Sequence, residues 1–381
     1  MNNHYEVVIV GAGSMGMAAG YYLSKLGIKT LLLDRNNPPH DLGSHHGETR
    51  IIRHAYGEGK QYVPLVLRAQ QLWEQLQQET GRQLFLPTGV LCAGAPGSTF
   101  ISEVVRSGQE FSLPLEVLSS EEMRHLWPGL TFPDGFVGCL EKKSGVLFSK
   151  HCIQAFRNQG LAHGMNLLPY TKVEKIDISS SGAIIKTATN SYHTDFVLIS
   201  AGAWSGKMLN RLGMDIPLHP VRKTVSWLKC DQELFESGVF PAFTVDLLNE
   251  HYYGFPSING SGFKVGRHDG GHRVDPDEGI SPYGADCNDE GDIRSFLQKY
   301  MPLANGPLIK GSTCMYTLTP DGDFIIDQHP EYPHLFIAAG FSGHGFKFSS
   351  VVGEIISQVV TKGKSDFDIS DFSIRNEQNN Y

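Results

Sequence analysis

Cysteine is scarce in this sequence, and it forms no paired motif. The six cysteines lie far apart and include no CxxC pair; they are Cys92, Cys139, Cys152, Cys230, Cys287 and Cys314. This spacing argues against a disulfide framework and against a zinc ribbon. We therefore expect a protein of a reducing, cytoplasmic compartment.

Long apolar runs and an excess of positive charge are also missing. No stretch approaches the roughly 18 apolar residues that a membrane-spanning helix needs, and the first residues, MNNHYE, lack the pattern of a secretory signal. The formal net charge of −8 gives no general basic field. We expect neither a nucleic acid nor a membrane as a partner, so any attraction for an anionic substrate must be local.

Glycine and apolar residues are abundant. The chain has 381 residues, of which 42 are glycine and 40% are hydrophobic. That length suffices for roughly two or three domains of ordinary size, each with a core of its own. The composition favours an α/β protein with many tight turns and close backbone approaches.

The N-terminus has the pattern of a nucleotide-binding unit. A short apolar strand at 5–10 leads into Gly11, Gly13 and Gly16 of a GxGxxG turn, a helix-like stretch follows, and a second strand ends at Asp34. The turn brings backbone N–H groups to a pyrophosphate at a helix N-terminus, and the acid binds ribose hydroxyls. The motif alone is weak, but its context makes a dinucleotide site the better interpretation. It does not separate FAD from NAD.

Two later segments repeat this pattern. Residues 171–203 predict short strands that end in FVLISAGAW, and residues 335–360 predict a strand, the loop FSGHGFK and an amphipathic helix. The segments between them are richer in alternating and aromatic patterns, as expected for an antiparallel sheet. We predict a cofactor domain from residues 1–86, 149–217 and 325–381, interleaved with a substrate domain from 87–148 and 218–324.

Four further segments carry a specific resemblance. They are GSHHGETRIIRHAYGE at 43–58, YYGFP at 252–256, CMYT at 314–317 and AAGFSGHGFKFSS at 338–350. In this order, through nearly the whole chain, the sequence resembles the bacterial monomeric sarcosine oxidases. The resemblance implies an α/β fold with a glutathione-reductase-type FAD domain and a substrate domain similar to those of D-amino acid oxidase and p-hydroxybenzoate hydroxylase.

The resemblance also implies an activity. It is FAD-dependent oxidation of sarcosine by O2 and water to glycine, formaldehyde and hydrogen peroxide, carried out by a monomer. The partners are thus a small secondary amino acid and O2. The amine must bind as its free base, and we expect nearby cations, from Arg53, Lys347 and His268, to lower its pKa.

Several residues gain cofactor roles in this way. By itself Cys314 would be a small buried hydrophobe, but it matches the family position that carries the flavin through an 8α-S-cysteinyl thioether. The glycine turn and Asp34 are joined as expected cofactor contacts by four residues from later segments, Val173, Gly343, Gly345 and Lys347.

The substrate and catalytic residues follow from the same resemblance. Arg53 and Lys347 match a pair that clamps the substrate carboxylate, a task that suits a planar guanidinium and a point charge; without it both would pass for surface cations. Lys264 matches the lysine that promotes reaction with O2. The remaining expected site residues are Arg50 and His46 beside the flavin ring, and His268, Tyr253, Tyr316 and Thr244 around the substrate.

Two departures from the family pattern keep the substrate open. Thr244 stands where the family commonly has Met, and Arg267 stands beside His268 where an aromatic residue is expected. A larger pocket would admit N-methyltryptophan, pipecolate, L-proline or a glycated amine. An FAD dehydrogenase that does not use O2 and a non-catalytic FAD-binding protein are further alternatives. His268 and His272 are spaced like metal ligands, but Gly270 and Gly271 disfavour a helix there, so we expect no metal.

Overall fold

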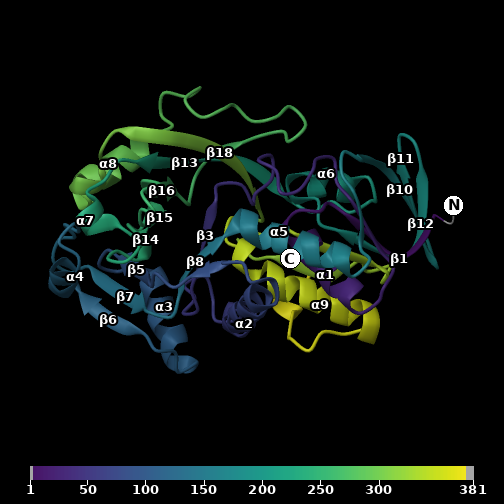
Figure 1. Ribbon diagram of the computed structural model, residues 1–381, viewed down its shortest axis with the longest axis horizontal. Coiled ribbons are helices and arrows are strands. Elements are labelled where there is room, and N and C mark those ends of the chain that lie inside the picture. The colour runs from purple at the N-terminus through teal and green to yellow at the C-terminus, as the bar shows by residue number, and fades with distance from the viewer. Residues whose placement is uncertain (1–2, 375–381) are drawn as a thin grey trace, which may run out of the picture.

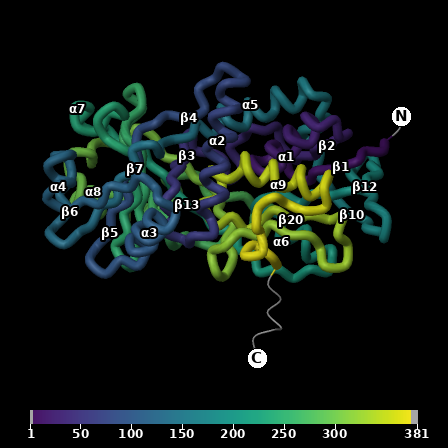
Figure 2. The backbone as a smooth tube through the Cα atoms, turned by 90° about the horizontal axis from the view of Figure 1, so that it is seen from below, coloured from purple at the N-terminus to yellow at the C-terminus, as the bar shows by residue number. Residues whose placement is uncertain are grey.

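The computed structural model describes residues 3–374 and has two halves (Figures 1 and 2). One half collects the N-terminal segment, the middle segment around β10 to β12 and the C-terminal segment, which lie side by side although they are far apart in sequence. The other half contains most of the intervening chain. Each half is built on its own large sheet.

The first sheet has a parallel core in the order β9–β2–β1–β12–β20. Its strands are β1 (His4–Val10), β2 (Thr30–Leu33), β9 (Asn166–Leu168), β12 (Ser191–Ile199) and β20 (Leu335–Ala339). β19 (Ile325–Gln328) closes one edge in antiparallel direction. The first half of β12 also pairs with β11 (Gly182–Thr187), which pairs with β10 (Val173–Ser179). The buried apolar strands predicted at 5–10, in 171–203 and from 335 are thus confirmed.

Helices from four parts of the chain pack together beside this sheet (Figure 1). They are α1 (Ser14–Lys25), α2 (Tyr62–Thr80), α5 (Ser149–Ala162) and α9 (Ser349–Lys362). α1 lies directly against α9, because Gly353 of α9 has no side chain to keep the two backbones apart. A Cβ at this position would come within 2.7 Å of the backbone of Ala18. The helix that follows the glycine turn and the helix that follows the FSGHGFK loop are therefore in direct contact.

The second sheet has nine strands in the order β17–β13–β16–β15–β14–β5–β7–β6, with β18 on the other side of β13. Its strands are β5 (Val90–Gly94), β6 (Glu116–Ser119), β7 (Val137–Glu141), β13 (His219–Leu228), β14 (Ala242–Asp246), β15 (His251–Phe255), β16 (Phe263–Arg267), β17 (His272–Arg273) and β18 (Leu308–Leu318). Neighbours are antiparallel except β14 and β5, which come from different segments and pair in parallel. An aromatic cluster that includes Phe240, Phe243 and Phe263 packs on it.

Smaller elements complete the fold. Helices α3 (Thr99–Glu110), α4 (Ser120–Leu126), α7 (Gln232–Phe235) and α8 (Gly291–Tyr300) belong to the half with the second sheet, and α6 (Ser205–Asn210) to the other (Figure 2). A three-stranded sheet of β3 (Thr49–Ile52), β8 (Gly145–Phe148) and β4 (Phe85–Leu86) joins chain from either side of the domain boundaries predicted near 86 and 148. Those boundaries remain a prediction.

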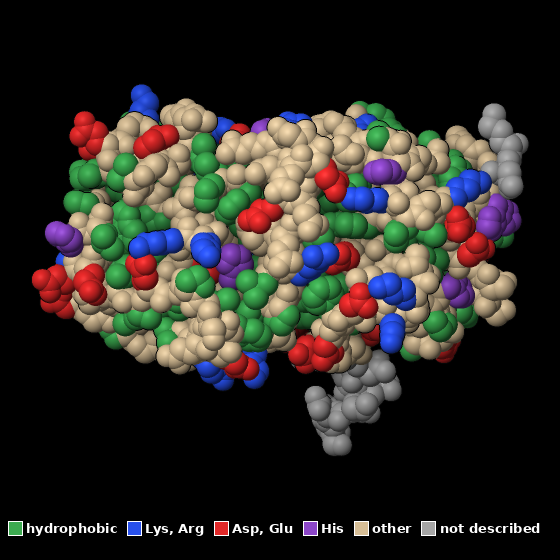
Figure 3. Space-filling model, turned by 60° about the horizontal axis from the view of Figure 1, so that its bottom comes forward, with side chains coloured by type: hydrophobic (Ala, Val, Ile, Leu, Met, Phe, Trp, Pro, Cys, Tyr) green, Lys and Arg blue, Asp and Glu red, His purple; other side chains and the backbone are tan. Residues whose placement is uncertain are grey.

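The surface shows no dominant charge on the face drawn in Figure 3, where cationic and anionic side chains are interspersed. Within residues 3–374, no helix is both long and apolar enough to cross a membrane. In the same residues, no group of three or more His, Cys, Asp and Glu side chains is placed to hold a metal ion.

Candidate active site

The glycine turn after β1 is shaped by close backbone contacts. Gly11 has a positive φ of 96°, which disfavours any side chain there. A Cβ on Gly16 would lie 2.0 Å from the carbonyl oxygen of Gly11, so this position also requires glycine. Asp34, at the end of β2, accepts the N–H of Ala12 at 2.8 Å and thereby fixes the acid beside the turn. The start of α1 is left facing a cavity.

This cavity, the cofactor cavity, has a volume of about 200 Å³ and is lined by the N-terminal, middle and C-terminal segments together. Among the residues expected to contact the cofactor, its lining includes Gly11, Gly13, Asp34, Val173, Gly343 and Gly345. Gly16 packs behind the turn. Lys347 does not line this cavity and faces the second one instead.

The second cavity, the inner pocket, is smaller, with a volume of about 70 Å³. Arg50, Tyr316, Gly343 and Phe346 line both cavities, so the two adjoin. Its other lining residues are Ile51, Arg53, Glu58, Thr244, His251, Tyr253, Phe255, His268, His344 and Lys347. The structure thus brings together the expected clamp residues and the expected substrate-lining residues.

Arg53 is paired with an internal carboxylate through one of its guanidinium nitrogens. It is buried, and its guanidinium donates to both oxygens of Glu58, at 2.7 and 2.6 Å, and to the carbonyl of Ala55 at 3.2 Å. Burial alone would raise the pKa of Glu58, but Arg53, supported by His344 and Lys347, lowers it below the usual range. The pocket therefore contains a fixed ion pair whose cation is the predicted clamp residue.

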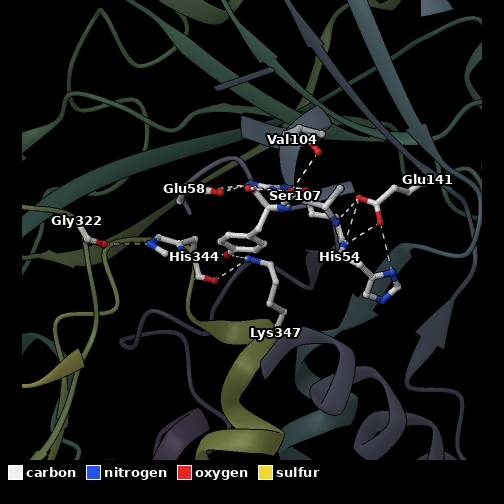
Figure 4. A network of polar contacts seen from close by, with 11 residues as sticks. His54, Glu58, Val104, Ser107, Glu141, Gly322, His344 and Lys347 are labelled. Atoms are coloured by element: carbon white, nitrogen blue, oxygen red, sulfur yellow. Dashed lines mark hydrogen bonds and ion pairs between the residues drawn. The ribbon is translucent and has the colours of Figure 1, made fainter. Parts of the chain in front are cut away.

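Lys347 is held by two acceptors in the network of Figure 4. Its ammonium donates to the hydroxyl of Tyr56 at 3.0 Å and to the carbonyl of His344 at 2.6 Å. Burial, reinforced by the charge of Arg53, lowers the pKa of Lys347 to about 7. Its charge therefore depends on pH near neutrality.

The backbone between Arg53 and Tyr56 is anchored by the second half of the molecule. Glu141 of β7 accepts the N–H groups of His54, at 2.9 Å, and of Ala55, at 3.1 Å, and Ser107 of α3 accepts the N–H of Tyr56 at 2.9 Å (Figure 4). A buried carboxylate and a buried hydroxyl thus fix the position of the backbone that follows Arg53.

An aromatic wall forms another side of the inner pocket. His268 packs against Tyr316, at 5.7 Å between ring centroids, and against Tyr253, at 6.4 Å, and the two tyrosine hydroxyls are 3.5 Å apart. Burial lowers the pKa of His268 well below its ordinary value, so the ring is neutral. The expectation that His268 supplies a positive charge is therefore wrong.

Thr244 lies on β14 in the lining of the same pocket. Its hydroxyl is buried, has no hydrogen-bond partner at ordinary distance among the described residues, and interacts with the thiol of Cys92. Its neighbour on β5 is Cys92, whose pKa is raised by burial to about 11. That thiol is neutral and bonds only weakly, so the threonine hydroxyl is available to a ligand.

Lys264 lies on β16 and lines neither cavity. Its Nζ donates to the carbonyl of Thr49 at 3.0 Å, to the Thr49 hydroxyl at 2.9 Å and to the carbonyl of Gly47, and lies 4.2 Å from the ring centroid of Phe255. Burial, with the charge of Arg50, lowers the pKa of Lys264. Arg50 itself binds the carbonyls of Ser44 and Thr49, both at 2.7 Å.

Two expected cofactor neighbours lie next to the cofactor cavity without lining it. His46 places Nδ1 2.8 Å from Asp41 and Nε2 2.5 Å from the hydroxyl of Ser312, while the adjacent His45 lines the cavity. Cys314 is a buried thiol on β18, and the three residues that follow it, Met315 to Thr317, line the cavity. Burial raises the pKa of Cys314, against the influence of Arg50, Lys264 and Lys223.

Among the ionisable side chains that line the inner pocket or bind Lys347, sequence reasoning missed four. They are Tyr56, Glu58, His251 and His344. Three of these lie inside the motifs that carried the resemblance, HAYGE and FSGHGFK. The sequence did offer one signal for Glu58. A cation that binds a substrate inside a pocket is buried and needs a partner when the substrate is absent, and Glu58 is an acid close to Arg53 in the sequence.

The family of the chain follows from comparison with known proteins. A family model described as FAD dependent oxidoreductase matches residues 6–359. The chain belongs to this family. The cofactor cavity fits the family's FAD, because its glycine turn leaves the space and the free N–H groups that a pyrophosphate requires.

Among curated members of the family, the chain is 50% identical to a monomeric sarcosine oxidase of Bacillus sp. (strain NS-129), over 99% of this chain and 98% of that one. It is equally similar, at 50%, to one from Arthrobacter sp. (strain TE1826), over 97% and 96%. It is 41% identical to an N-methyl-L-tryptophan oxidase of Yersinia pestis (strain Pestoides F), over 97% and 98%. The chain therefore also belongs to the monomeric sarcosine oxidase group predicted from its motifs.

Solved structures confirm the predicted fold. NikD, an amino acid oxidase of nikkomycin biosynthesis, superposes with a TM-score of 0.85 at 20% identity over 98% of both chains. L-proline dehydrogenase from P. horikoshii gives 0.86 at 21% identity over 98% of this chain and 97% of that one. At these identities the likeness concerns the fold alone.

Proposed function

We propose that this FAD-dependent oxidoreductase oxidises sarcosine, with O2 as electron acceptor, to glycine, formaldehyde and hydrogen peroxide. The observation that carries the proposal is the inner pocket: two buried cations, Arg53 and Lys347, lie in a small cavity that adjoins the cofactor cavity. The 50% identity to monomeric sarcosine oxidases over nearly the whole chain supports it.

The two cations bind the substrate carboxylate. A guanidinium engages both oxygens of a carboxylate in one plane, and an ammonium adds a further charge-assisted hydrogen bond. Because Arg53 is bound to Glu58 in the pocket, an incoming carboxylate competes with that side chain or shares the guanidinium with it. The clamp orients the amine and its methyl group towards the cofactor cavity.

The aromatic wall accepts the amine without a charge of its own. His268, Tyr253 and Tyr316 are all buried in the pocket, and the imidazole is neutral. The free-base form of the amine is favoured by the nearby charges of Arg53 and Lys347, which penalise a third cation. No strong side-chain base is required, because the free amine has its own lone pair.

FAD, when bound, supplies the two-electron chemistry that converts the amine to an imine, which water then hydrolyses. Lys264 donates its N–H groups beside Arg50 and promotes the reaction with O2, where a positive charge stabilises the reduced oxygen species. Arg50 and His46 lie beside the flavin ring when FAD is bound. Cys314 carries the flavin through an 8α-S-cysteinyl bond, a role supported by its place directly before the cavity-lining residues Met315 to Thr317.

We further propose that the enzyme acts as a monomer in the cytoplasm, in keeping with the monomeric relatives. The alternative substrate class is a larger N-methyl amino acid, and the specific observation in its favour is Thr244 in the pocket lining, with the 41% identical N-methyl-L-tryptophan oxidases as precedent. L-proline, pipecolate and glycated amines are further candidate substrates, to be included in the same substrate panel.

A substrate panel with oxygen electrode and peroxide detection decides among these. Sarcosine is expected to give the highest kcat/KM, with one peroxide released for each O2 consumed. Turnover with a dye but none with O2 would identify a dehydrogenase and contradict the oxidase. A preference for N-methyltryptophan over sarcosine would assign the larger substrate class.

A further inference from the structure

The contacts of Lys347 extend into a chain of hydrogen bonds whose direction is determined. Starting from Lys347, the chain runs through the Tyr56 hydroxyl to Nδ1 of His344 at 3.0 Å, and from Nε2 of His344 to the carbonyl of Gly322 at 3.1 Å (Figure 4). A carbonyl only accepts, so Nε2 carries a proton and donates. This fixes one end of the chain.

The protonation state of His344 then sets the direction of the remaining bonds. Burial lowers the pKa of His344 to about 4, so near neutral pH the ring carries only its Nε2 proton. Nδ1 must therefore accept, and the Tyr56 hydroxyl donates to it. The hydroxyl hydrogen is thereby committed, and the Tyr56 oxygen can only accept from Lys347.

These bonds leave Lys347 with a single free position on Nζ. One N–H goes to Tyr56 and a second to the carbonyl of His344. The remaining position belongs to the inner pocket, which Lys347 lines. In an ammonium that position is an N–H donor, and in a neutral amine it is a lone pair, which repels a carboxylate.

We propose that Tyr56 and His344 are positioning residues that aim one N–H of Lys347 at the substrate carboxylate, and that carboxylate binding is coupled to uptake of one proton by Lys347. The inference rests on the clamp role of Lys347 in the proposed function. An amino acid substrate must lose a proton from its own amino group to become the free base. That loss is balanced by the proton that Lys347 gains. A carboxylate without an amine takes its proton from the buffer.

The charges around Lys347 are consistent with this coupling. Arg53 and Arg50 lower its pKa after burial, Glu58 opposes them, and the neighbouring thiol of Cys92 has a raised pKa and is neutral. The ammonium is present below the pKa of about 7 and is lost as pH rises through it. Carboxylate affinity should therefore fall with rising pH across neutrality.

The test measures binding of acetate to the flavin-loaded enzyme as a function of pH, by the change in the flavin spectrum. Calorimetry in two buffers of different ionisation enthalpy counts the protons taken up. The wild-type enzyme is expected to bind acetate more weakly by up to about tenfold for each pH unit above the pKa of Lys347, with uptake approaching one proton on the alkaline side.

Tyr56→Phe removes the acceptor that favours the ammonium, so the break in the pH profile is expected to move to lower pH and neutral-pH affinity to fall. Tyr62→Phe is the matched control: its ring packs 5.0 Å from Tyr56, but its hydroxyl donates to Asp323. It should keep the wild-type profile. If Tyr56→Phe does not fold with flavin, His344→Leu removes the acceptor of the same hydroxyl and is expected to shift the profile in the same direction.

The outcomes separate this inference from the function on which it rests. If acetate does not compete with sarcosine in the wild-type enzyme, the carboxylate clamp itself fails. If acetate competes but both Tyr56→Phe and His344→Leu retain the wild-type profile and proton count, the clamp stands and the positioning role of Tyr56 and His344 is refuted. A shift of equal size in Tyr62→Phe would also refute it, because the effect would then not be specific to the Tyr56 hydroxyl.

Discussion

The cofactor cavity and the inner pocket are built on different principles although they share four lining residues. The cofactor cavity depends on backbone, with glycines at places where a Cβ has no room. The inner pocket depends on buried ionisable side chains, whose pKa values burial shifts from their ordinary range. If the proposed function holds, recognition of the large cofactor relies on shape and N–H groups, whereas recognition of the small substrate relies on desolvated charge.

The largest effect is expected where backbone packing is tightest. Gly16→Ala places a Cβ 2.0 Å from the carbonyl of Gly11, so the turn must distort. We expect purified Gly16→Ala protein to lack flavin absorbance and to unfold at a lower temperature than wild type.

Gly13→Ala provides the contrast within the same turn. A Cβ there meets nothing closer than 3.9 Å in the protein, but Gly13 lines the cofactor cavity. This variant should therefore fold normally and bind FAD less well. Equal loss of thermal stability in both variants would show that the turn does not separate folding from cofactor binding.

Covalent attachment is expected to be lost completely in Cys314→Ala, because the thiolate is the nucleophile of a thioether bond. Acid precipitation should leave the yellow colour in the pellet of the wild-type protein and in the supernatant of the variant. Mass spectrometry that finds an unmodified Cys314 peptide in flavin-loaded wild-type enzyme would contradict the attachment.

Lys264→Met should slow reoxidation of the reduced enzyme by O2 by roughly two to three orders of magnitude, the usual cost of removing one electrostatic stabiliser. Reduction by sarcosine should change much less. Since burial lowers the pKa of Lys264, reoxidation in the wild-type enzyme should also slow as pH rises and the ammonium loses its proton. Stopped-flow spectroscopy separates the two half-reactions, and equal slowing of both would reassign Lys264 to substrate binding or structure.

Arg53→Lys keeps the charge but loses the planar fork, so carboxylate affinity should fall. The loss of a charge-assisted hydrogen bond costs about 1.5–3 kcal/mol, or roughly ten- to a hundredfold in Kd. Lys347→Met should have a smaller effect, because it removes one of the two cations and leaves the fork. Acetate titrations of the flavin-loaded variants measure both, and unchanged dissociation constants in both would place the carboxylate elsewhere.

The smallest effect is expected for Thr244→Met, which introduces the residue that the family resemblance leads us to expect at this position. The longer side chain fills part of the pocket, and differences of this size change selectivity by about 1–3 kcal/mol. The ratio of kcat/KM for sarcosine to that for N-methyltryptophan should rise. Thr244→Ser, which keeps a hydroxyl and removes only a methyl group, is the control and should leave the ratio near that of wild type.

The same comparison shows how far the sequence could predict the structure. The cofactor turn was accessible because β1, the glycines, α1 and Asp34 follow one another directly, and their periodicity is local. The placement of Arg53 and Lys347 in one pocket could not be predicted from local patterns, because it depends on contacts between the segment around β3 and the loop after β20. Only the resemblance to a known family placed these two residues in one site.

Partners and charge states were the hardest features to predict. Glu58 belongs to a motif that was recognised, yet the contact of both its oxygens with Nη2 of Arg53 depends on the tertiary path of the loop. His268 was expected to be a cation, and burial among Tyr253, Tyr316 and His251 makes it neutral instead. Desolvation is a property of the packed structure, and residue type alone does not report it.

The contact between Gly353 and Ala18 has a consequence for the entropy of ligand binding. It joins α1, which begins at the glycine turn, to α9, which follows the FSGHGFK loop, with no side chain between their backbones. The two loops that border the cofactor cavity are therefore mounted on one rigid helix pair. A ligand that bridges them has little motion left to freeze, so more of its contact energy is retained as affinity. A larger residue at position 353 would force the helices apart and restore that motion, even though it touches neither cavity.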